Sequence, residues 1–279
     1  MFRNDLLAGK RILITGGGTG IGRSIGRRYL SLGAELVICG RREPVLAEAA
    51  ESLQHETGGK VAFKACDIRE AAQVEDLLGW VWQNGPLHGL VNNAAGNFIA
   101  QSETLSPRAV DAVLGIVLHG SAYMTLGCGK RWLAEGRHAS VLSIITTYAW
   151  TGSAYVVPSA MAKAGVLALT RSLAVEWGGR GIRLNAIAPG PFPTEGAWER
   201  LVPKPELAAA FEAKNPLHRA GHHDELANLA SFLMADETGY INGEVVTIDG
   251  GEWLQGAGQF NFIGGMMSPA DWQKLRPKK

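Results

Sequence analysis

The sequence is poor in cysteine, in long apolar runs, in net charge and in residues that could form an N-terminal leader. Its three cysteines, Cys39, Cys66 and Cys128, form no C-x-x-C pair, which argues against a metal site and a disulfide framework. No run of eighteen apolar residues is present, which argues against a membrane span. Lys and Arg number 27 against 26 Asp and Glu, so a nucleic-acid partner is disfavoured. The short stretch before the first apolar run leaves no room for a signal peptide, so we expect a cytoplasmic protein.

Short runs rich in Val, Ile and Leu alternate with segments of helical periodicity along the whole chain. Such runs, without strict polar alternation, are typical of strands covered on both faces. The alternation predicts an α/β fold, a single doubly wound Rossmann-type domain over residues 1–279 with a parallel seven-stranded sheet. The predicted strands are residues 11–15, 35–39, 61–65, 89–93, 140–144, 183–188 and 244–249. Residues 189–216, rich in proline, form a long excursion after the sixth strand, which is typical of a substrate lid.

A glycine-rich turn follows the first predicted strand. Residues 15–22 read TGGGTGIG, with the spacing G-x-x-x-G-x-G between a strand and a helix. Glycines at such a turn let backbone N–H groups and a helix N-terminus approach a pyrophosphate. A strand-to-helix turn can also need glycine for structural reasons alone. Its position at the start of a βαβ unit favours a dinucleotide site.

The residues after the second and third strands bear on the choice of cofactor. Dinucleotide sites that prefer NAD place a carboxylate on the ribose about twenty residues after the turn, whereas this chain has Gly40-Arg41-Arg42. A guanidinium would pair with a 2′-phosphate, so Arg41 favours NADPH. The alternative is a pair of solvated arginines. Asp67 could accept a hydrogen bond from the adenine amino group or cap the helix that follows.

The segment 146–163 is the predicted catalytic stretch. It joins an apolar strand to a helix that opens near Pro158 and carries Lys163 one turn in, pointing back toward the strand end. Two tyrosines, Tyr148 and Tyr155, precede the lysine, but Ser159 occupies the position four residues before it. The question posed by this stretch is which hydroxyl acts with Lys163.

With these motifs in order, the chain resembles the short-chain dehydrogenase/reductase family over essentially its whole length. TGGGTGIG, NNAAG, the lysine helix after the fifth strand and the segment from Asn185 to Pro189-Gly190 all match. The resemblance is sharpest to the NADPH-dependent 2,4-dienoyl-CoA reductases. The stretches that carry it are residues 92–98, 145–148, 156–163, 189–194 and 250–261.

The resemblance implies roles for individual residues. Most of the family uses a tyrosine four residues before the lysine as proton donor, and Ser159 shows that it is absent here. In the dienoyl-CoA reductases, Tyr148 and Asn97 would instead hydrogen-bond the thioester oxygen, with Lys163 on the nicotinamide ribose and Ser159 and Thr146 in support. The turn and the resemblance together assign NADPH to Gly16, Gly17, Gly18, Thr19, Gly20, Ile21, Arg41, Asp67, Ile68, Asn93, Ala95, Lys163, Pro189, Gly190 and Phe192. The acyl-CoA substrate is assigned to Arg69, Phe98, Ser106 and Arg200.

This assignment makes chemical sense. Hydride addition to the δ carbon of a dienoyl thioester leaves a dienolate with its charge largely on the thioester oxygen. Two neutral donors aimed at that oxygen form an oxyanion hole, worth about 3–4 kcal/mol per donor. Protonation at the α carbon then gives 3-enoyl-CoA. A ketone reductase would instead need a strongly acidic donor beside the lysine, which Ser159 is not.

Several alternatives remain open from the sequence. The protein could reduce 2-enoyl-CoA, another acyl thioester or a carbonyl, with Tyr155 as an unusual donor. It could also be a non-catalytic NADP-binding regulator. His119 stands where the family usually has an asparagine, but a lone helical histidine is more often structural than catalytic, so it is left out of the catalytic set. Residues 250–267 could cover the acyl site or meet a neighbouring subunit, and family analogy predicts a homotetramer.

Overall fold

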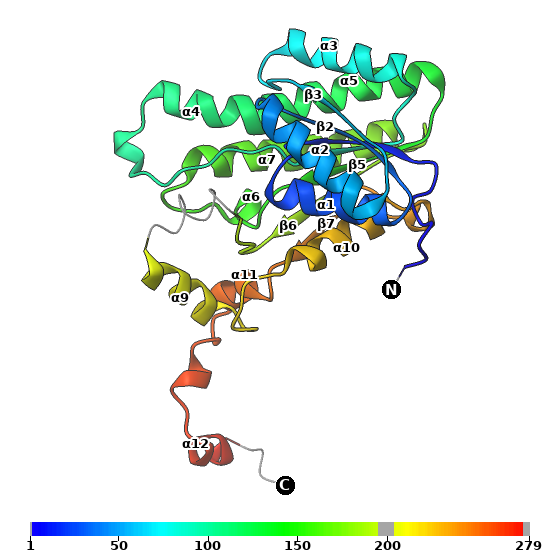
Figure 1. The fold of residues 1–279 in the computed structure, drawn as a ribbon. Helices are drawn as coiled ribbons and strands as arrows, with labels where there is room; N and C mark the ends of the chain where they lie inside the picture. Colours follow the sequence, from blue (N-terminus) through cyan, green and yellow to red (C-terminus); the bar gives the residue numbers. More distant parts are fainter. Residues whose placement is uncertain (1, 195–203, 276–279) are drawn as a thin grey trace.

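The computed structural model describes residues 2–194 and 204–275 (Figure 1). These residues form a seven-stranded sheet in the order β3-β2-β1-β4-β5-β6-β7. Every pairing is parallel, which confirms the predicted doubly wound α/β fold. The strands are β1 (Arg11–Thr15), β2 (Glu35–Gly40), β3 (Val61–Ala65), β4 (Gly89–Asn92), β5 (Ala139–Ile144), β6 (Ile182–Pro189) and β7 (Val245–Ile248).

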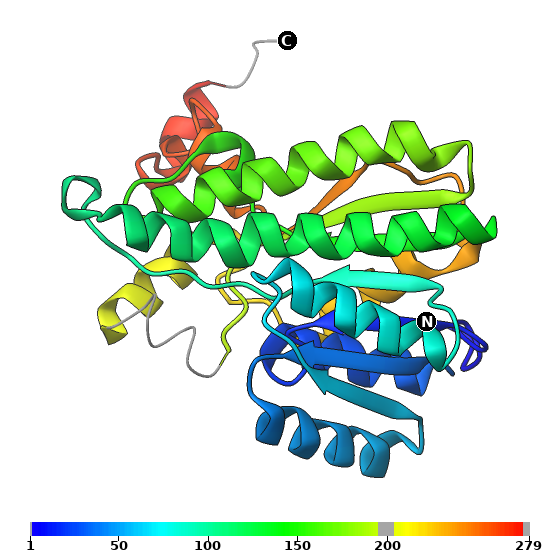
Figure 2. The same ribbon diagram turned by 90° about the horizontal axis from the view of Figure 1, so that it is seen from above.

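Helices cover both faces of the sheet (Figures 1 and 2). One face carries α1, α2 and α10, and the other carries α3, α5 and α7. The helices are α1 (Gly20–Ser31), α2 (Glu43–Thr57), α3 (Ala71–Gln83), α4 (Pro107–Leu114), α5 (Gly120–Glu135), α6 (Tyr148–Thr151), α7 (Val157–Gly178), α9 (Pro205–Lys214), α10 (His223–Met234), α11 (Glu252–Ala257) and α12 (Pro269–Lys274). Short 3₁₀ turns are η1 (Ser102–Thr104), η3 (Asp236–Thr238) and η4 (Ile263–Gly265).

Side-chain alternation along β1 shows how one strand supports two cores. Ile12 and Ile14 are fully buried under α1 and α10, whereas Leu13 is fully buried on the opposite side. Successive side chains of a strand point to opposite faces, so a continuous apolar run is required where both faces are covered. The central strands are therefore rigid supports for the loops at their carboxyl ends.

The strand order reverses between β1 and β4, and this fixes where a ligand can bind. The loops after these neighbouring strands leave in opposite directions, which opens a crevice at the carboxyl edge of the sheet. The predicted fourth strand ended at Asn93, but β4 ends at Asn92. Asn93 leaves the ladder because its backbone N–H and its side chain both bond to Thr15 instead.

The longest helical segment contains a π-helical turn, η2 (Gly115–His119), between α4 and α5. Within the described part of the chain, the segment Pro107–Glu135 is the one helix long and apolar enough to cross a membrane, with a mean hydropathy of 1.4. Core helices of globular proteins meet the same criterion, and this segment packs against α3 and α7 (Figure 2).

The chain after β7 extends away from the sheet (Figure 1). Helix α11 follows β7, and α12 projects beyond it at the C-terminal end of the described chain. The predicted excursion 189–216 includes α9, while residues 195–203 of it lie outside the described residues.

Candidate active site

The turn between β1 and α1 is shaped to approach a phosphate. Gly16 and Gly20 have φ angles of +66° and +52°, a region that side chains with a Cβ rarely adopt. A Cβ on Gly16 would also lie 3.1 Å from the Cα of Ala94. Thr19 is the N-cap of α1 and makes no side-chain capping bond within the described structure. The first N–H groups of α1 therefore stay available, which suits a pyrophosphate at the helix N-terminus.

A hydrogen-bond network ties this turn to the loop after β4. Thr15 Oγ1 accepts from the backbone N–H groups of Asn93 and Ala94, both at 3.0 Å. Asn93 Nδ2 in turn donates to Thr15 O at 2.9 Å. The structure thus brings the predicted cofactor residue Asn93 beside the glycine turn, and the predicted residue Ala95 follows in the same loop.

The ends of β2 and β3 bring two arginines near one carboxylate. Asp67 accepts from Arg69 through the backbone N–H at 3.1 Å and through Nε at 2.9 Å. These hydrogen bonds, with a smaller contribution from Arg41, lower the pKa of Asp67. The helix-capping interpretation of Asp67 is wrong, because α3 begins at Ala71 with Glu70 as its N-cap. Arg41 is exposed after β2, where a charged ribose phosphate could reach it.

Three of the predicted catalytic residues meet at one point. Tyr148 is the first residue of α6, and its hydroxyl lies 3.0 Å from Ser159 Oγ on α7. Asn97, in the loop after β4, donates from Nδ2 to the same hydroxyl at 3.3 Å. A fourth, Thr146, hydrogen-bonds to Tyr148 as well. The Asn97–Tyr148 pair places two neutral donors around a common position.

Burial controls the protonation of this cluster. It raises the pKa of Tyr148, and the hydrogen bonds from Ser159 and Thr146 oppose that rise in part. The tyrosine is therefore a neutral hydrogen-bond donor at physiological pH. Burial also lowers the pKa of Lys163 to about 8. The ammonium donates to the carbonyl of Ile144 at the end of β5, so the predicted orientation toward the strand end is confirmed.

Tyr155 lies apart from this cluster. Helix α7 begins at Val157, so Tyr155 belongs to the loop before it, and the residue is 59% exposed. Its φ of +65° is left-handed, and its carbonyl accepts from Ala100 N–H at 3.0 Å. This contact joins the loop that carries Tyr155 to the loop that carries Asn97.

The three described substrate residues lie along the segment formed by α4 and η2. Phe98 packs against the apolar cluster under η2. Ser106 is the N-cap of α4 and accepts from Ala109 N–H at 3.2 Å. Arg69 lies beside η2 as well, because a Cβ on Gly115 would contact its Cδ at 3.5 Å. Arg200 lies outside the described residues.

The π-turn itself was not expected from the sequence. His119 ends it, is exposed, and its ring lies 6.1 Å from that of Tyr123. π-turns are frequent at functional sites, because the extra residue displaces the helix backbone. Gly115, which opens the turn, and Gly120, which follows it, are the available signal in the sequence, and they do not specify a π-turn.

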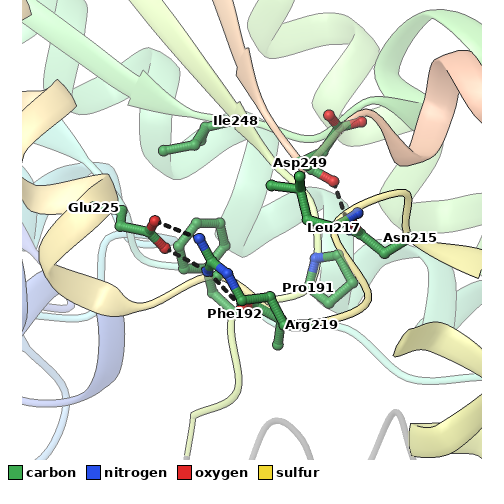
Figure 3. Close-up of a pocket in the computed structure, with 11 residues that line it drawn as sticks. Pro191, Phe192, Asn215, Leu217, Arg219, Glu225, Ile248 and Asp249 are labelled. Carbon is green, nitrogen blue, oxygen red and sulfur yellow. Dashed lines mark hydrogen bonds and ion pairs between the residues drawn. The ribbon is translucent and has the colours of Figure 1, made fainter. Parts of the chain in front are cut away.

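The segment at the end of β6, residues 189–194, packs against residues that were not identified from the sequence (Figure 3). Gly190 lies against Asp249, whose Cβ would be 2.7 Å from a Cβ on the glycine. Asn215 is buried and donates from Nδ2 to Asp249 O at 2.8 Å. A cavity of about 80 Å³ lies between these residues and Phe192, too small for an acyl-CoA. Asn215 and Asp249 thus support the predicted cofactor residue Gly190, while Pro189 pairs with Ile248 of β7 and Phe192 packs against Gly221.

Comparison with known proteins identifies the family. Residues 16–252 match the family described as Enoyl-(Acyl carrier protein) reductase. A "Probable 2,4-dienoyl-CoA reductase [(2E)-enoyl-CoA-producing]" of Bacillus subtilis is 42% identical over 88% of this chain and 97% of that protein. The chain belongs to the short-chain dehydrogenase/reductase family. This short-chain dehydrogenase/reductase is therefore an oxidoreductase that takes a nicotinamide cofactor.

Other relatives agree with the family assignment. A "Probable 2,4-dienoyl-CoA reductase 3 [(3E)-enoyl-CoA-producing]" of Caenorhabditis elegans is 41% identical over 90% of this chain and 83% of its own. A short-chain dehydrogenase structure from Bacillus anthracis has a TM-score of 0.80 at 38% identity, covering 88% of this chain and 96% of that one. A putative 2-deoxy-d-gluconate 3-dehydrogenase from Agrobacterium tumefaciens, solved with bound NADP, has a TM-score of 0.83 at 31% identity and covers 90% and 100%.

Proposed function

We propose that the protein is an NADPH-dependent 2,4-dienoyl-CoA reductase that forms 3-enoyl-CoA in the β-oxidation of unsaturated fatty acids. The observation that carries this proposal is the cluster of Asn97, Tyr148 and Ser159 near a lysine that lacks the usual tyrosine partner. The names of the relatives support the same substrate class.

The paired donors suit a thioester oxygen that gains negative charge. Because Asn97 Nδ2 and the Tyr148 hydroxyl are 3.3 Å apart, a substrate oxygen beside the pair could lie within hydrogen-bond distance of both and accept from each. Bound NADPH would supply the hydride that reaches the δ carbon of the substrate. Asn97 and Tyr148 would then donate to the dienolate oxygen, and Ser159 would donate to the phenol oxygen and keep it in place.

The raised pKa of Tyr148 supports charge stabilisation rather than ketone reduction. A ketone reductase must protonate an alkoxide, so its tyrosine benefits from a lowered pKa beside the lysine. Burial shifts the pKa of Tyr148 in the opposite direction. Such a tyrosine stabilises charge by donating a hydrogen bond and keeps its proton. The final proton at the α carbon would come from water.

Lys163 and Arg41 would secure the cofactor at its two ends. Lys163 is buried beside the end of β5 and has a donor group that could leave Ile144 O for the nicotinamide ribose. Arg41 is exposed after β2, where a 2′-phosphate would give it a charge-assisted bond. This arrangement supports NADPH over NADH.

The decisive experiment is an NADPH-consumption assay on 2,4-dienoyl, 2-enoyl and 3-oxoacyl CoA thioesters of matched chain length. We expect turnover of the dienoyl substrate and little of the other two. Preference for 2-enoyl or 3-oxoacyl substrate would replace the proposal with the corresponding reductase. Binding of NADPH without turnover of any substrate would favour a non-catalytic regulator.

The position of the product double bond is a separate question. The relative from Bacillus subtilis is named as (2E)-enoyl-producing, whereas that from Caenorhabditis elegans is named as (3E)-enoyl-producing. Protonation at the α carbon by water gives the 3-enoyl product, which we propose for this chain. Nuclear magnetic resonance of the product distinguishes the two isomers, and a 2-enoyl product would place the proton donor near the γ carbon.

The homotetramer stays a prediction. Leu126 on α5 and Val175 on α7 are 47% and 85% exposed, which would suit burial against further copies. Light scattering on the purified protein measures the assembly directly.

A further inference from the structure

Two tryptophans join the helix that carries Tyr148 to the C-terminal part of the chain. Trp150 lies in α6, two residues after Tyr148, and Trp253 lies in α11. Their rings meet edge to face, with centroids 5.8 Å apart and an angle of 84° between the planes. Aromatic pairs prefer this arrangement, because the positive edge of one ring faces the negative face of the other. The pair is therefore a specific contact between two segments that are far apart in the sequence.

Helix α6 has little stability of its own. It is four residues long, and its N-cap, Thr147, makes no side-chain capping bond. The N–H groups of Trp150 and Thr151 both donate to the carbonyl of Thr147, at long distances of 3.3 and 3.4 Å. A single helical turn does not persist without tertiary contacts, because its formation fixes several dihedral angles for one hydrogen bond. The position of the Tyr148 hydroxyl therefore depends on what packs against α6.

Contacts on two sides hold α6 in place. On the inner side, Ala149 is buried in the apolar cluster of α7 and η2, and the Tyr148 hydroxyl lies 3.0 Å from Ser159 Oγ. Residues two apart in a helix point in roughly opposite directions, so Trp150 faces away from Tyr148. Trp150 is 39% exposed, and Trp253 covers part of its ring. The contact between the two tryptophans thus supports α6 from the outer side.

Trp253 is itself held in place by the carboxylate of Asp249. Asp249 Oδ1 accepts from Gly251 N–H at 2.9 Å, and its Oδ2 accepts from Trp253 N–H at 3.0 Å. The backbone carbonyl of Asp249 accepts from Asn215 Nδ2 at 2.8 Å (Figure 3). These bonds fix the start of α11 to the end of β7. Helix α11 therefore offers Trp150 a fixed surface.

We propose that Trp253 is a positioning residue for the reduction and that it acts through Trp150. It supports α6 so that the Tyr148 hydroxyl stays beside Asn97. Loss of the Trp253 ring should let α6 shift, and a donor displaced by about 1 Å loses much of its effect on the transition state. The inference rests on the proposed role of Tyr148 as a donor to the substrate oxygen.

The kinetic test replaces the ring on α11. Trp253→Ala should lower kcat on a 2,4-dienoyl-CoA by about tenfold, since misplacement by about 1 Å can cost up to about a hundredfold. The KM for this substrate and the dissociation constant of NADPH should change much less, because Trp253 is assigned to neither ligand. Trp253→Phe keeps an aromatic edge and should retain most of the activity. Trp272→Ala removes an exposed ring from α12 and is the matched control, with kcat expected to stay unchanged.

Double variants show whether the effect passes through Trp150 and Tyr148. In the Tyr148→Phe background the hydroxyl is already absent, so Trp253→Ala should lower kcat little further. Trp150→Ala and Trp253→Ala remove the same contact, so their losses should not multiply either. Losses that multiply in either pair, or an unchanged kcat in Trp253→Ala, would overturn the inference. Circular dichroism checks the fold, and Trp253→Leu, which keeps apolar bulk without a ring, gives the same test where the alanine variant is unfolded.

A measurement without turnover separates this inference from the proposed function. Tyrosine labelled with ¹³C at Cζ gives a nuclear magnetic resonance signal for each of the five tyrosines, and Tyr148→Phe identifies the signal of Tyr148. Trp253→Ala should move or broaden that signal, whereas Trp272→Ala should leave it unchanged. An unmoved signal in Trp253→Ala would refute the inference and leave the proposed function standing. If the signal moves but no dienoyl-CoA is reduced, the proposed function fails and the positioning of Tyr148 by Trp253 stands.

Discussion

The side-chain amide of Asn97 lies 3.3 Å from the hydroxyl of Tyr148, a residue 51 positions further along the chain. The loop after β4 supplies the amide, and α6, which follows β5, supplies the phenol. Because β4 and β5 are neighbours in the sheet, their carboxyl ends deliver both donors to one place. Asn97 donates to the Tyr148 hydroxyl here, so the two side chains are already adjacent before any substrate binds.

Removing either donor should slow the reaction without weakening the coenzyme. We expect Tyr148→Phe and Asn97→Ala each to lower kcat by about 10² to 10³, the usual loss for one oxyanion donor. NADPH affinity should stay near normal, because neither side chain is assigned to the cofactor. Steady-state kinetics on a dienoyl-CoA, with NADPH binding measured separately, checks both parts.

Tyr155→Phe is the matched control for Tyr148→Phe. It removes the same hydroxyl from the exposed tyrosine of the following loop, and we expect nearly unchanged kcat. If Tyr155→Phe lowers kcat strongly and Tyr148→Phe does not, the donor has been assigned to the wrong tyrosine.

Arg41→Ala should change the choice of coenzyme. The guanidinium would form a charge-assisted bond with the 2′-phosphate, worth about 1.5–3 kcal/mol, which corresponds to roughly tenfold to hundredfold in the dissociation constant of NADPH. NADH lacks that phosphate, so its binding should change little. Arg42→Ala, which removes the neighbouring charge, is the control. An equal loss of NADPH and NADH affinity in Arg41→Ala would exclude the phosphate contact.

The fold could be predicted from the sequence because the same pattern, a short apolar run, recurs in every strand. Runs such as Arg11–Thr15 and Val61–Ala65 coincide with β1 and β3, since strands buried on both faces must be apolar throughout. Lys163 could likewise be placed near the end of β5, because it lies in the first turns of the helix that follows this strand, which begins at Val157 beside the expected Pro158. These features depend on local sequence and on the order of the strands.

Contacts between segments that are distant in the sequence could not be predicted from such a pattern. His223 meets Ser24 across 199 residues, and Asn215 meets Asp249 across 34, and no local pattern encodes either pair. The bond between Asp67 and Arg69 is local, yet it competes with a helix cap that the sequence favours equally. Which of these two hydrogen-bond arrangements forms depends on side-chain geometry, and the periodicity of apolar residues carries no information about it.

The buried lysine makes stability depend on alkaline pH. Burial lowers the pKa of Lys163 to about 8 from a value of 10.5 when exposed, so between these pH values the unfolded state binds more protons than the folded state. The free energy of unfolding should therefore rise as the pH increases through this window, and the cost of burying the charge is fully present below it. Urea unfolding at several pH values measures the slope.

Lys163→Met is the variant that isolates this effect. It removes the buried charge and keeps much of the side-chain volume, so stability near pH 7 should increase by on the order of 1–3 kcal/mol and the alkaline slope should shrink. Activity should be lost, since the ribose contact would be gone. An unchanged slope in this variant would mean that another group titrates.

The left-handed backbone at Tyr155 predicts an unusual order of stability among substitutions. Its φ of +65° strains any residue that carries a Cβ, and glycine adopts this conformation freely. Tyr155→Gly and Tyr155→Ala both remove the same exposed ring, and they differ only in the strained Cβ. Although glycine has the more flexible unfolded chain, we expect Tyr155→Gly to be more stable than Tyr155→Ala by about 1 kcal/mol, because relief of the strain is the larger effect. Thermal unfolding of the two variants checks this order. A more stable alanine variant would show that the loop relaxes to a right-handed conformation. That change would require the bond between Ala100 N–H and the carbonyl of residue 155 to rearrange.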